Sequence, residues 1–132
     1  MSAADYVFAN SDSIASQRLQ LLAELYDPVT RACLERTGIA PGWSCWEVGA
    51  GYGTIAQWMH ERVAPEGHVL ATDLDPRFLA RLAQHNLRVM RHDMVDGPLP
   101  KESFDLIHAR LLLCHLPTRE HVLERMIDAL KP

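Results

Sequence analysis

The sequence predicts a single α/β domain built on a parallel β-sheet, and three observations support this fold class. The chain has 132 residues, a length that suits one domain. From Ser44 onward, short apolar segments alternate with stretches of helical periodicity, which is the order of parallel strands joined by crossover helices. The apolar segments contain few polar positions, as expected when helices cover both faces of a sheet.

Composition excludes several other classes of protein. Hydrophobic residues make up 48% and charged residues 23%, which is globular rather than disordered composition. The formal charge of −4 argues against a nucleic-acid partner. The three cysteines include no C-x-x-C pair, so neither a disulfide framework nor a zinc ribbon is expected. The chain shows no secretory signal and no apolar run long enough to cross a bilayer, so we expect a cytoplasmic protein without a membrane partner.

Residues 1–40 are expected to form an N-terminal helical segment. Apolar residues recur there at helical spacing, namely Ile14, Leu21, Leu22 and Leu25. The pair Asp27-Pro28 is typical of a helix start, and Gly38 of a helix end. The sequence therefore predicts a second helix over residues 29–37.

Residues 41–132 are expected to form the α/β core, with strands over 44–48, 69–72, 87–90 and 104–107. Helices are expected around Ile55, Trp58, Met59 and Val63, from Asp75-Pro76 to Asn86, and after a cap at Thr118, with Val122, Leu123, Met126 and Leu130 facing inward. We expect the strand order 3-2-1-4. Ligands of open α/β sheets bind beyond the carboxyl ends of the strands where the order reverses, here between the first and fourth strands.

A glycine cluster, Gly49-x-Gly51-x-Gly53, follows the first strand. Glycine permits positive φ and close approach of a ligand, although a trio alone is equally compatible with a turn that binds nothing. Asp73 ends the second strand, 20 residues after Gly53, where a carboxylate can accept both ribose hydroxyls. A dinucleotide fingerprint requires glycine at position 54, which is Thr54 here, so a pyrophosphate site is disfavoured.

Five segments in order give the chain a resemblance to a known family. Glu47-x-Gly49-x-Gly51-x-Gly53 resembles the first motif of the class I S-adenosylmethionine (SAM)-dependent methyltransferases, which have a Rossmann-like fold. The other matching segments are Val69–Pro76, Arg91–Met94, Ser103–Arg110, and His115–Pro117 with the terminal Ala129–Pro132. The resemblance covers about residues 41–132. It implies a SAM-dependent methyltransferase that acts on a small-molecule acceptor and releases S-adenosylhomocysteine.

The resemblance also implies which residues bind SAM. Glu47 and the glycine loop would hold the methionine part, Asp73 the ribose, Leu74 and Met94 the adenine ring, and Asp93 the adenine amino group. The implied cofactor-binding residues are Glu47, Gly49, Ala50, Gly51, Gly53, Asp73, Leu74, Asp93, Met94 and Arg110. An acidic site suits the sulfonium cation of SAM. No catalytic residue is assigned, and the scattered histidines predict no metal site.

Several alternatives remain open from the residues. Arg110 either contacts the cofactor or is a surface arginine. His115 is either a general base or a structural histidine. The N-terminal helices are candidates for a lid, with Tyr6, Gln17 and Arg18 as the residues to consider. For the whole chain, the alternatives are a non-catalytic SAM-binding module and an NAD-dependent oxidoreductase.

The sheet is expected to stop after the fourth strand and its helix. The resembled family continues with further strands, so the fourth strand would be left as an exposed, apolar edge strand, a feature that natural proteins avoid. We therefore expect either a truncated domain with an incomplete acceptor half or a second chain over this edge. A homodimer is compatible with the latter.

Overall fold

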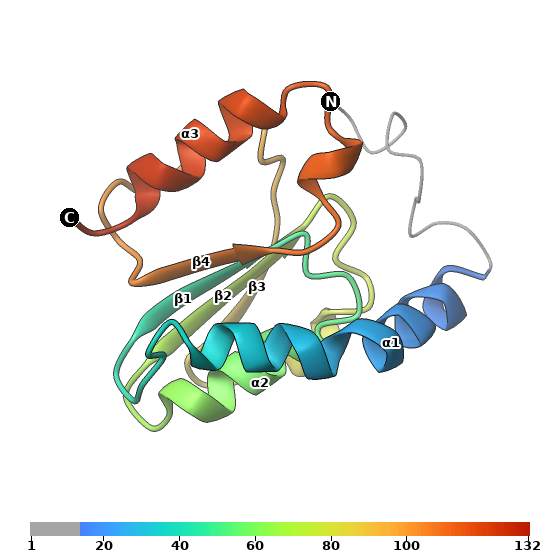
Figure 1. Ribbon diagram of the computed structural model, residues 1–132, viewed down its shortest axis with the longest axis horizontal. Coiled ribbons are helices and arrows are strands. Elements are labelled where there is room, and N and C mark those ends of the chain that lie inside the picture. The colour runs from blue at the N-terminus through green and yellow to red at the C-terminus, as the bar shows by residue number, and fades with distance from the viewer. Residues whose placement is uncertain (1–13) are drawn as a thin grey trace.

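The structure, a computed structural model, describes residues 14–132 and contains one four-stranded parallel sheet. The strands are β1 (Ser44–Val48), β2 (His68–Asp73), β3 (Leu87–Arg91) and β4 (Leu106–Ala109). Their order is β3-β2-β1-β4, which confirms the predicted topology. All three pairings are parallel, so the carboxyl ends of the strands lie along one edge of the sheet (Figure 1).

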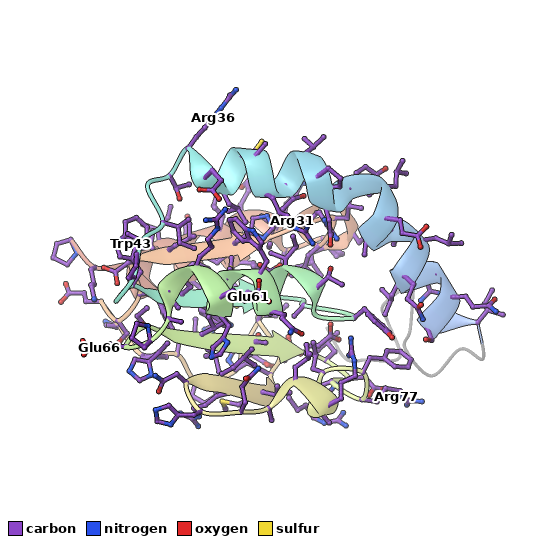
Figure 2. All side chains as sticks on the ribbon, turned by 90° about the horizontal axis from the view of Figure 1, so that it is seen from below. Arg31, Arg36, Trp43, Glu61, Glu66 and Arg77 are labelled. Carbon is purple, nitrogen blue, oxygen red and sulfur yellow. The ribbon has the colours of Figure 1, made fainter. Side chains whose placement is uncertain are left out.

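Helices cover both faces of the sheet. The helices α1 (Ala15–Glu35) and α2 (Thr54–Val63) lie on one face, and α3 (Arg119–Ala129) lies on the other (Figure 1). Figure 2 looks onto the first face and shows α1 and α2 side by side in front of the strands. The N-terminal half of α1 extends past the carboxyl ends of the strands (Figure 1). One helix therefore reaches the edge where parallel sheets bind their ligands.

The core has two parts, one on each side of the sheet. Met59 and Val63 of α2 are fully buried and pack with β1 and β2 residues, while Val122 of α3 packs on the opposite side. Trp46 is buried in the second part, and its indole N–H donates to Thr72 Oγ1 at 2.9 Å, which satisfies both polar groups. The predicted inward positions of α2 (Ile55, Trp58, Met59 and Val63) are all buried, which confirms the periodicity.

The N-terminal region differs from the prediction of two helices. One helix of 21 residues, α1, runs through Pro28 without ending. Three of the four predicted apolar positions also do not face the sheet, because Ile14, Leu21 and Leu25 are 58%, 64% and 67% exposed. The helix buries Ala15, Ala23, Asp27 and Leu34 instead. Within residues 14–132, no helix has the length and apolarity that crossing a membrane requires.

Two core elements also differ from their predicted form. The expected helix from Asp75-Pro76 to Asn86 is a series of turns with one short 3₁₀ helix, η2 (Ala80–Leu82). The Asp75 carboxylate accepts the backbone N–H of Arg77, and such a local bond competes with helix formation. The fourth strand begins at Leu106 rather than 104, because the backbone of Phe104 bonds to the end of α3 instead of to β1.

The C-terminal elements follow the expected plan with one exception. A second 3₁₀ helix, η3 (Leu113–His115), links β4 to α3. Thr118 occupies the N-cap position of α3 as predicted, but its side chain makes no capping hydrogen bond. Val122 and Met126 are buried, whereas Leu123 is 47% exposed, so the prediction that Leu123 faces inward is wrong. β4 pairs only with β1 and lies at the edge of the described sheet.

Two substitutions compare the contributions of a buried position on α2 and an exposed position on α1 to the free energy of unfolding. Met59→Ala removes a side chain that is fully buried between α2 and the sheet, so we expect the free energy of unfolding to fall by about 2–5 kcal/mol. Leu25→Ala on the exposed side of α1 should change it by less than about 0.5 kcal/mol. Urea unfolding followed by circular dichroism measures both. Equal losses would contradict the observed orientation of α1.

Candidate functional site

The loop after β1 gives the site its backbone geometry. Gly49 and Gly51 have φ values of +65° and +59°, a conformation that favours glycine. The loop is tied to the neighbouring strand, since the N–H of Ala50 donates to the carbonyl of Thr72 at 2.9 Å. A Cβ added at Gly49 would lie 3.0 Å from Leu112, and one at Gly51 would lie 3.3 Å from Leu19. Glycine therefore keeps the space above the loop open.

Asp73, at the end of β2, is held against this loop. Its Oδ2 accepts the N–H of Gly51 at 3.0 Å and its Oδ1 accepts the N–H of Asp75 at 3.1 Å. Burial raises the pKa of Asp73 above its ordinary value, and the N–H groups of Asp75 and Gly51 oppose that shift. These bonds orient the Asp73 carboxylate against the glycine loop.

Glu47, in β1, is buried and paired with a neighbouring strand. Parallel pairing places it directly opposite His108 of β4, and His108 Nδ1 lies 2.7 Å from Glu47 Oε2. Burial raises the pKa of Glu47, while the hydrogen bond and charge of His108 and the charge of Arg110 lower it. The site thus contains a second carboxylate whose ionised form is stabilised by adjacent positive charge.

Arg110, just after β4, connects the site to α1. Its Nη1 donates to Asp27 Oδ1 at 2.7 Å and to Thr30 Oγ1 at 3.1 Å. Asp27 is only 5% exposed, and the guanidinium also lies 6.0 Å from the ring centroid of Tyr26. Arg110 is therefore not a solvated surface residue, because its side chain is hydrogen-bonded to α1.

Two neighbouring cavities lie over these residues. The larger has a volume of about 390 Å³, which is within the usual range for small-molecule sites, and its walls include Glu47, Asp73 and Arg110. The smaller, of about 60 Å³, shares Asp73 with the larger one and is lined by apolar and polar residues that include Leu74, Asp93 and Met94. Asp73, Gly49 and Arg110 line both cavities.

The structure brings all ten sequence-predicted site residues to the walls of these cavities. Glu47, Gly49, Ala50, Gly51, Gly53, Asp73 and Arg110 line the larger one, and Gly49, Asp73, Leu74, Asp93, Met94 and Arg110 line the smaller one. Gly53 has a packing role as well, because a Cβ there would lie 2.3 Å from Leu82. Of the lid candidates, Arg18 lines the larger cavity, while Tyr6 lies outside the described residues.

Sequence reasoning missed several residues of the site. Leu19 and Leu22 of α1 and Leu111 after β4 line the larger cavity, and so does His115, which the sequence had offered as a general base or a structural histidine. His108 and Asp27, the partners of Glu47 and Arg110, were also not identified. A polar residue interrupting each of two apolar strands was a signal for the Glu47–His108 pair. No local signal in α1 distinguishes Asp27 from a helix-capping residue.

The arrangement suits one molecule with several chemically different parts. Two carboxylates, Glu47 and Asp73, can accept hydroxyls or bind a cation, and a guanidinium can bind an anion. Apolar side chains of the smaller cavity can contact a flat ring. Within residues 14–132, no group of three or more His, Cys, Asp or Glu side chains is arranged to hold a metal ion.

Comparison with known proteins identifies relatives of this chain. The family described as a methyltransferase domain matches residues 46–132. The chain is 42% identical over 88 residues to methyltransferase str2 of Strobilurus tenacellus, covering 65% of this chain and 31% of that protein. It is 24% identical over 110 residues to the ubiquinone/menaquinone biosynthesis C-methyltransferase UbiE of Ectopseudomonas mendocina, covering 77% of this chain and 43% of that protein.

Solved structures share the fold. A SAM-dependent methyltransferase from Aquifex aeolicus superposes with a TM-score of 0.73 at 23% identity, covering 88% of this chain and 67% of that one. This likeness confirms the predicted Rossmann-like architecture. The chain spans about a third of the length of str2 and less than half that of UbiE.

The buried carboxylate at the end of β2 predicts a particular pH dependence. Because the folded-state pKa of Asp73 is raised, the folded state binds its proton more tightly than the unfolded state does. This carboxyl group therefore contributes stability below its ordinary pKa, near 4, and that contribution is lost as the pH rises through the raised value.

Asp73→Asn removes this titration. We expect the variant to gain stability relative to the unsubstituted chain as the pH rises from about 3 to 7. Urea unfolding at a series of pH values measures the difference. Asp75→Asn is the control, because the pKa of Asp75 is lowered by Arg77 and its difference should change in the opposite direction. A difference for Asp73→Asn that is constant with pH would contradict the assignment.

Proposed function

This chain belongs to the methyltransferase domain family, and on that basis we propose that it binds SAM in the two cavities and transfers the methyl group to a small-molecule acceptor. The observation that carries the proposal is the bond between Gly51 and Asp73. It places a glycine loop and a carboxylate from the neighbouring strand around one space. A nucleoside with an amino-acid extension would contact the glycine loop and the carboxylate together in that space.

The parts of SAM correspond to the two cavities in this proposal. Asp73, which lines both cavities, would accept the ribose hydroxyls. The adenine ring would lie in the smaller cavity against Leu74 and Met94, with Asp93 accepting from its amino group. Glu47 and the glycine loop would hold the methionine part in the larger cavity. Gly49, Ala50 and Gly51 present backbone there without a large side chain.

The chain's own residues would contribute alignment and charge. When bound, SAM supplies an electrophilic methyl group on a sulfonium. Glu47 and Asp73 place negative charge in the cavity that would hold this cation, so binding would offset part of the cost of burying the two carboxylates. Leu19, Leu22 and Leu111 cover the same cavity and would exclude water from it. Alignment and exclusion of water can account for much of the rate of such a transfer.

A small-molecule acceptor is supported by the size of the larger cavity and by one relative. The volume of that cavity, about 390 Å³, is within the usual range for small-molecule sites. The name of UbiE assigns that protein to quinone biosynthesis, where acceptors are small. We propose cytoplasmic localisation as well, because Cys33, Cys45 and Cys114 are all free thiols.

Cofactor binding is tested by calorimetric titration with SAM and S-adenosylhomocysteine. We expect both to bind, and Asp73→Ala to lower the affinity for S-adenosylhomocysteine at least tenfold, since two charge-assisted hydrogen bonds would be lost. Asp75→Asn is the matched control, because that carboxylate pairs with Arg77 outside both cavities. Unchanged affinity in Asp73→Ala would remove the ribose assignment.

The acceptor class is tested by following the methyl group. The chain is incubated with SAM carrying a radioactive methyl group and a cell extract from which small molecules have not been removed. We expect label to appear in the organic-extractable fraction. Label confined to acid-precipitable protein or nucleic acid would contradict a small-molecule acceptor. Binding of S-adenosylhomocysteine without any transfer would support the alternative of a non-catalytic binding module.

A further inference from the structure

A charged residue is buried in the middle of α1, on the side facing the site. Asp27 is 5% exposed, although α1 continues from it to Glu35 and it lies far from either helix end. Burying an ionised carboxylate is costly unless it is paired and hydrogen-bonded. Asp27 has two cationic neighbours, Arg110 at 2.7 Å and Arg31 at 3.7 Å. The shorter contact crosses 83 residues of sequence.

Asp27 does not itself line the cavities assigned to SAM. It lies in the wall of a separate surface groove between α1 and the start of α2, together with Arg31, Tyr52 and Thr54. Arg110 lines both SAM cavities. Asp27 can therefore affect a molecule in those cavities through Arg110, to which it is hydrogen-bonded.

The hydrogen bonds of Arg110 leave one side of its guanidinium for a ligand. Asp27 and Thr30 both accept from Nη1, and among the residues that the structure describes neither Nη2 nor Nε has a hydrogen-bond partner. A guanidinium presents its donors in a planar fork that matches a carboxylate. Fixing Nη1 on α1 fixes the direction in which the remaining donors point.

The charges around the larger cavity are arranged in two groups. Glu47 and Asp73 supply negative charge, and Arg110 with Arg18 of α1 supplies positive charge. The amino-acid end of SAM has one ammonium and one carboxylate. The carboxylates of the site suit the ammonium and the sulfonium, whereas the carboxylate of the ligand requires a cation.

From these observations we propose that Asp27 is a positioning residue: it orients the guanidinium of Arg110 to bind the carboxylate at the amino-acid end of SAM. The inference rests on the proposed function and extends it to a residue on α1. Because Asp27 belongs to α1 and Arg110 follows β4, binding of that carboxylate is coupled to the placement of α1 over the site.

Two ligands separate this role from general support of the fold. S-adenosylhomocysteine has the amino-acid end, and methylthioadenosine has the same nucleoside and thioether without it. In calorimetric titrations of the whole chain, we expect Asp27→Asn to weaken S-adenosylhomocysteine about tenfold, since a charge-assisted bond is lost, and to leave methylthioadenosine unchanged. Glu35→Gln, which removes another ion pair of α1 with Arg62 of α2, should alter neither affinity.

A double-mutant cycle tests whether Asp27 acts through Arg110. Arg110→Gln should weaken S-adenosylhomocysteine at least as much as Asp27→Asn, and the double variant should be no weaker than Arg110→Gln alone. If Asp27→Asn does not fold, Thr30→Val replaces it. Thr30→Val removes the other acceptor of Nη1, and we expect a loss of about threefold, again only for S-adenosylhomocysteine.

The outcomes distinguish this inference from the proposed function. Equal loss of both ligands in Asp27→Asn, additive losses in the double variant, or unchanged affinity for S-adenosylhomocysteine would overturn the role of Asp27. Failure of the unsubstituted chain to bind either ligand would instead overturn the proposed SAM site. Binding of both ligands with a loss specific to S-adenosylhomocysteine would support both.

Discussion

The contact between the glycine loop and Asp73 is the constraint on which the site depends. The backbone N–H of Gly51 can reach Asp73 Oδ2 only because β1 and β2 are adjacent, parallel and in a register that ends both strands at the same edge. The positive φ of Gly49 and Gly51 turns the chain back over that edge instead of away from it. Every other group of the site is placed relative to this pair, since both cavities share Asp73 and Gly49.

The site contains two carboxyl groups, Glu47 and Asp73, whose burial disfavours their ionised forms. Burial raises the pKa of Glu47 and of Asp73, so keeping both ionised near neutral pH reduces the stability of the folded chain. His108, Arg110 and backbone N–H groups offset part of this cost. A residual cost of this kind is typical of functional sites, because a cationic ligand can offset it on binding.

The α1 helix shows how far local patterns determine structure. The spacing of Ile14, Leu21 and Leu25 correctly indicated a helix, but these side chains face solvent. The pair Asp27-Pro28 has the form of a helix start, yet Asp27 is buried against Arg110 and the helix continues through Pro28. The partner of Asp27 lies 83 residues away, so the information that decides its burial is absent from the local sequence.

The sequence alone determined the strand order, the glycine turn and the position of Asp73 at the end of a strand, because these follow from short-range features, whereas its resemblance to a known family indicated the other predicted residues that line the cavities. Such features are the alternation of strands and helices, the need for glycine at positive φ, and an acid at the end of a strand. Only the tertiary structure decided the pairing of Glu47 with His108, the joining of Arg110 to α1, and the replacement of the expected helix after Asp75 by turns. These outcomes depend on the register between strands and on which backbone groups a side chain meets, and neither is fixed by residues that are neighbours in sequence.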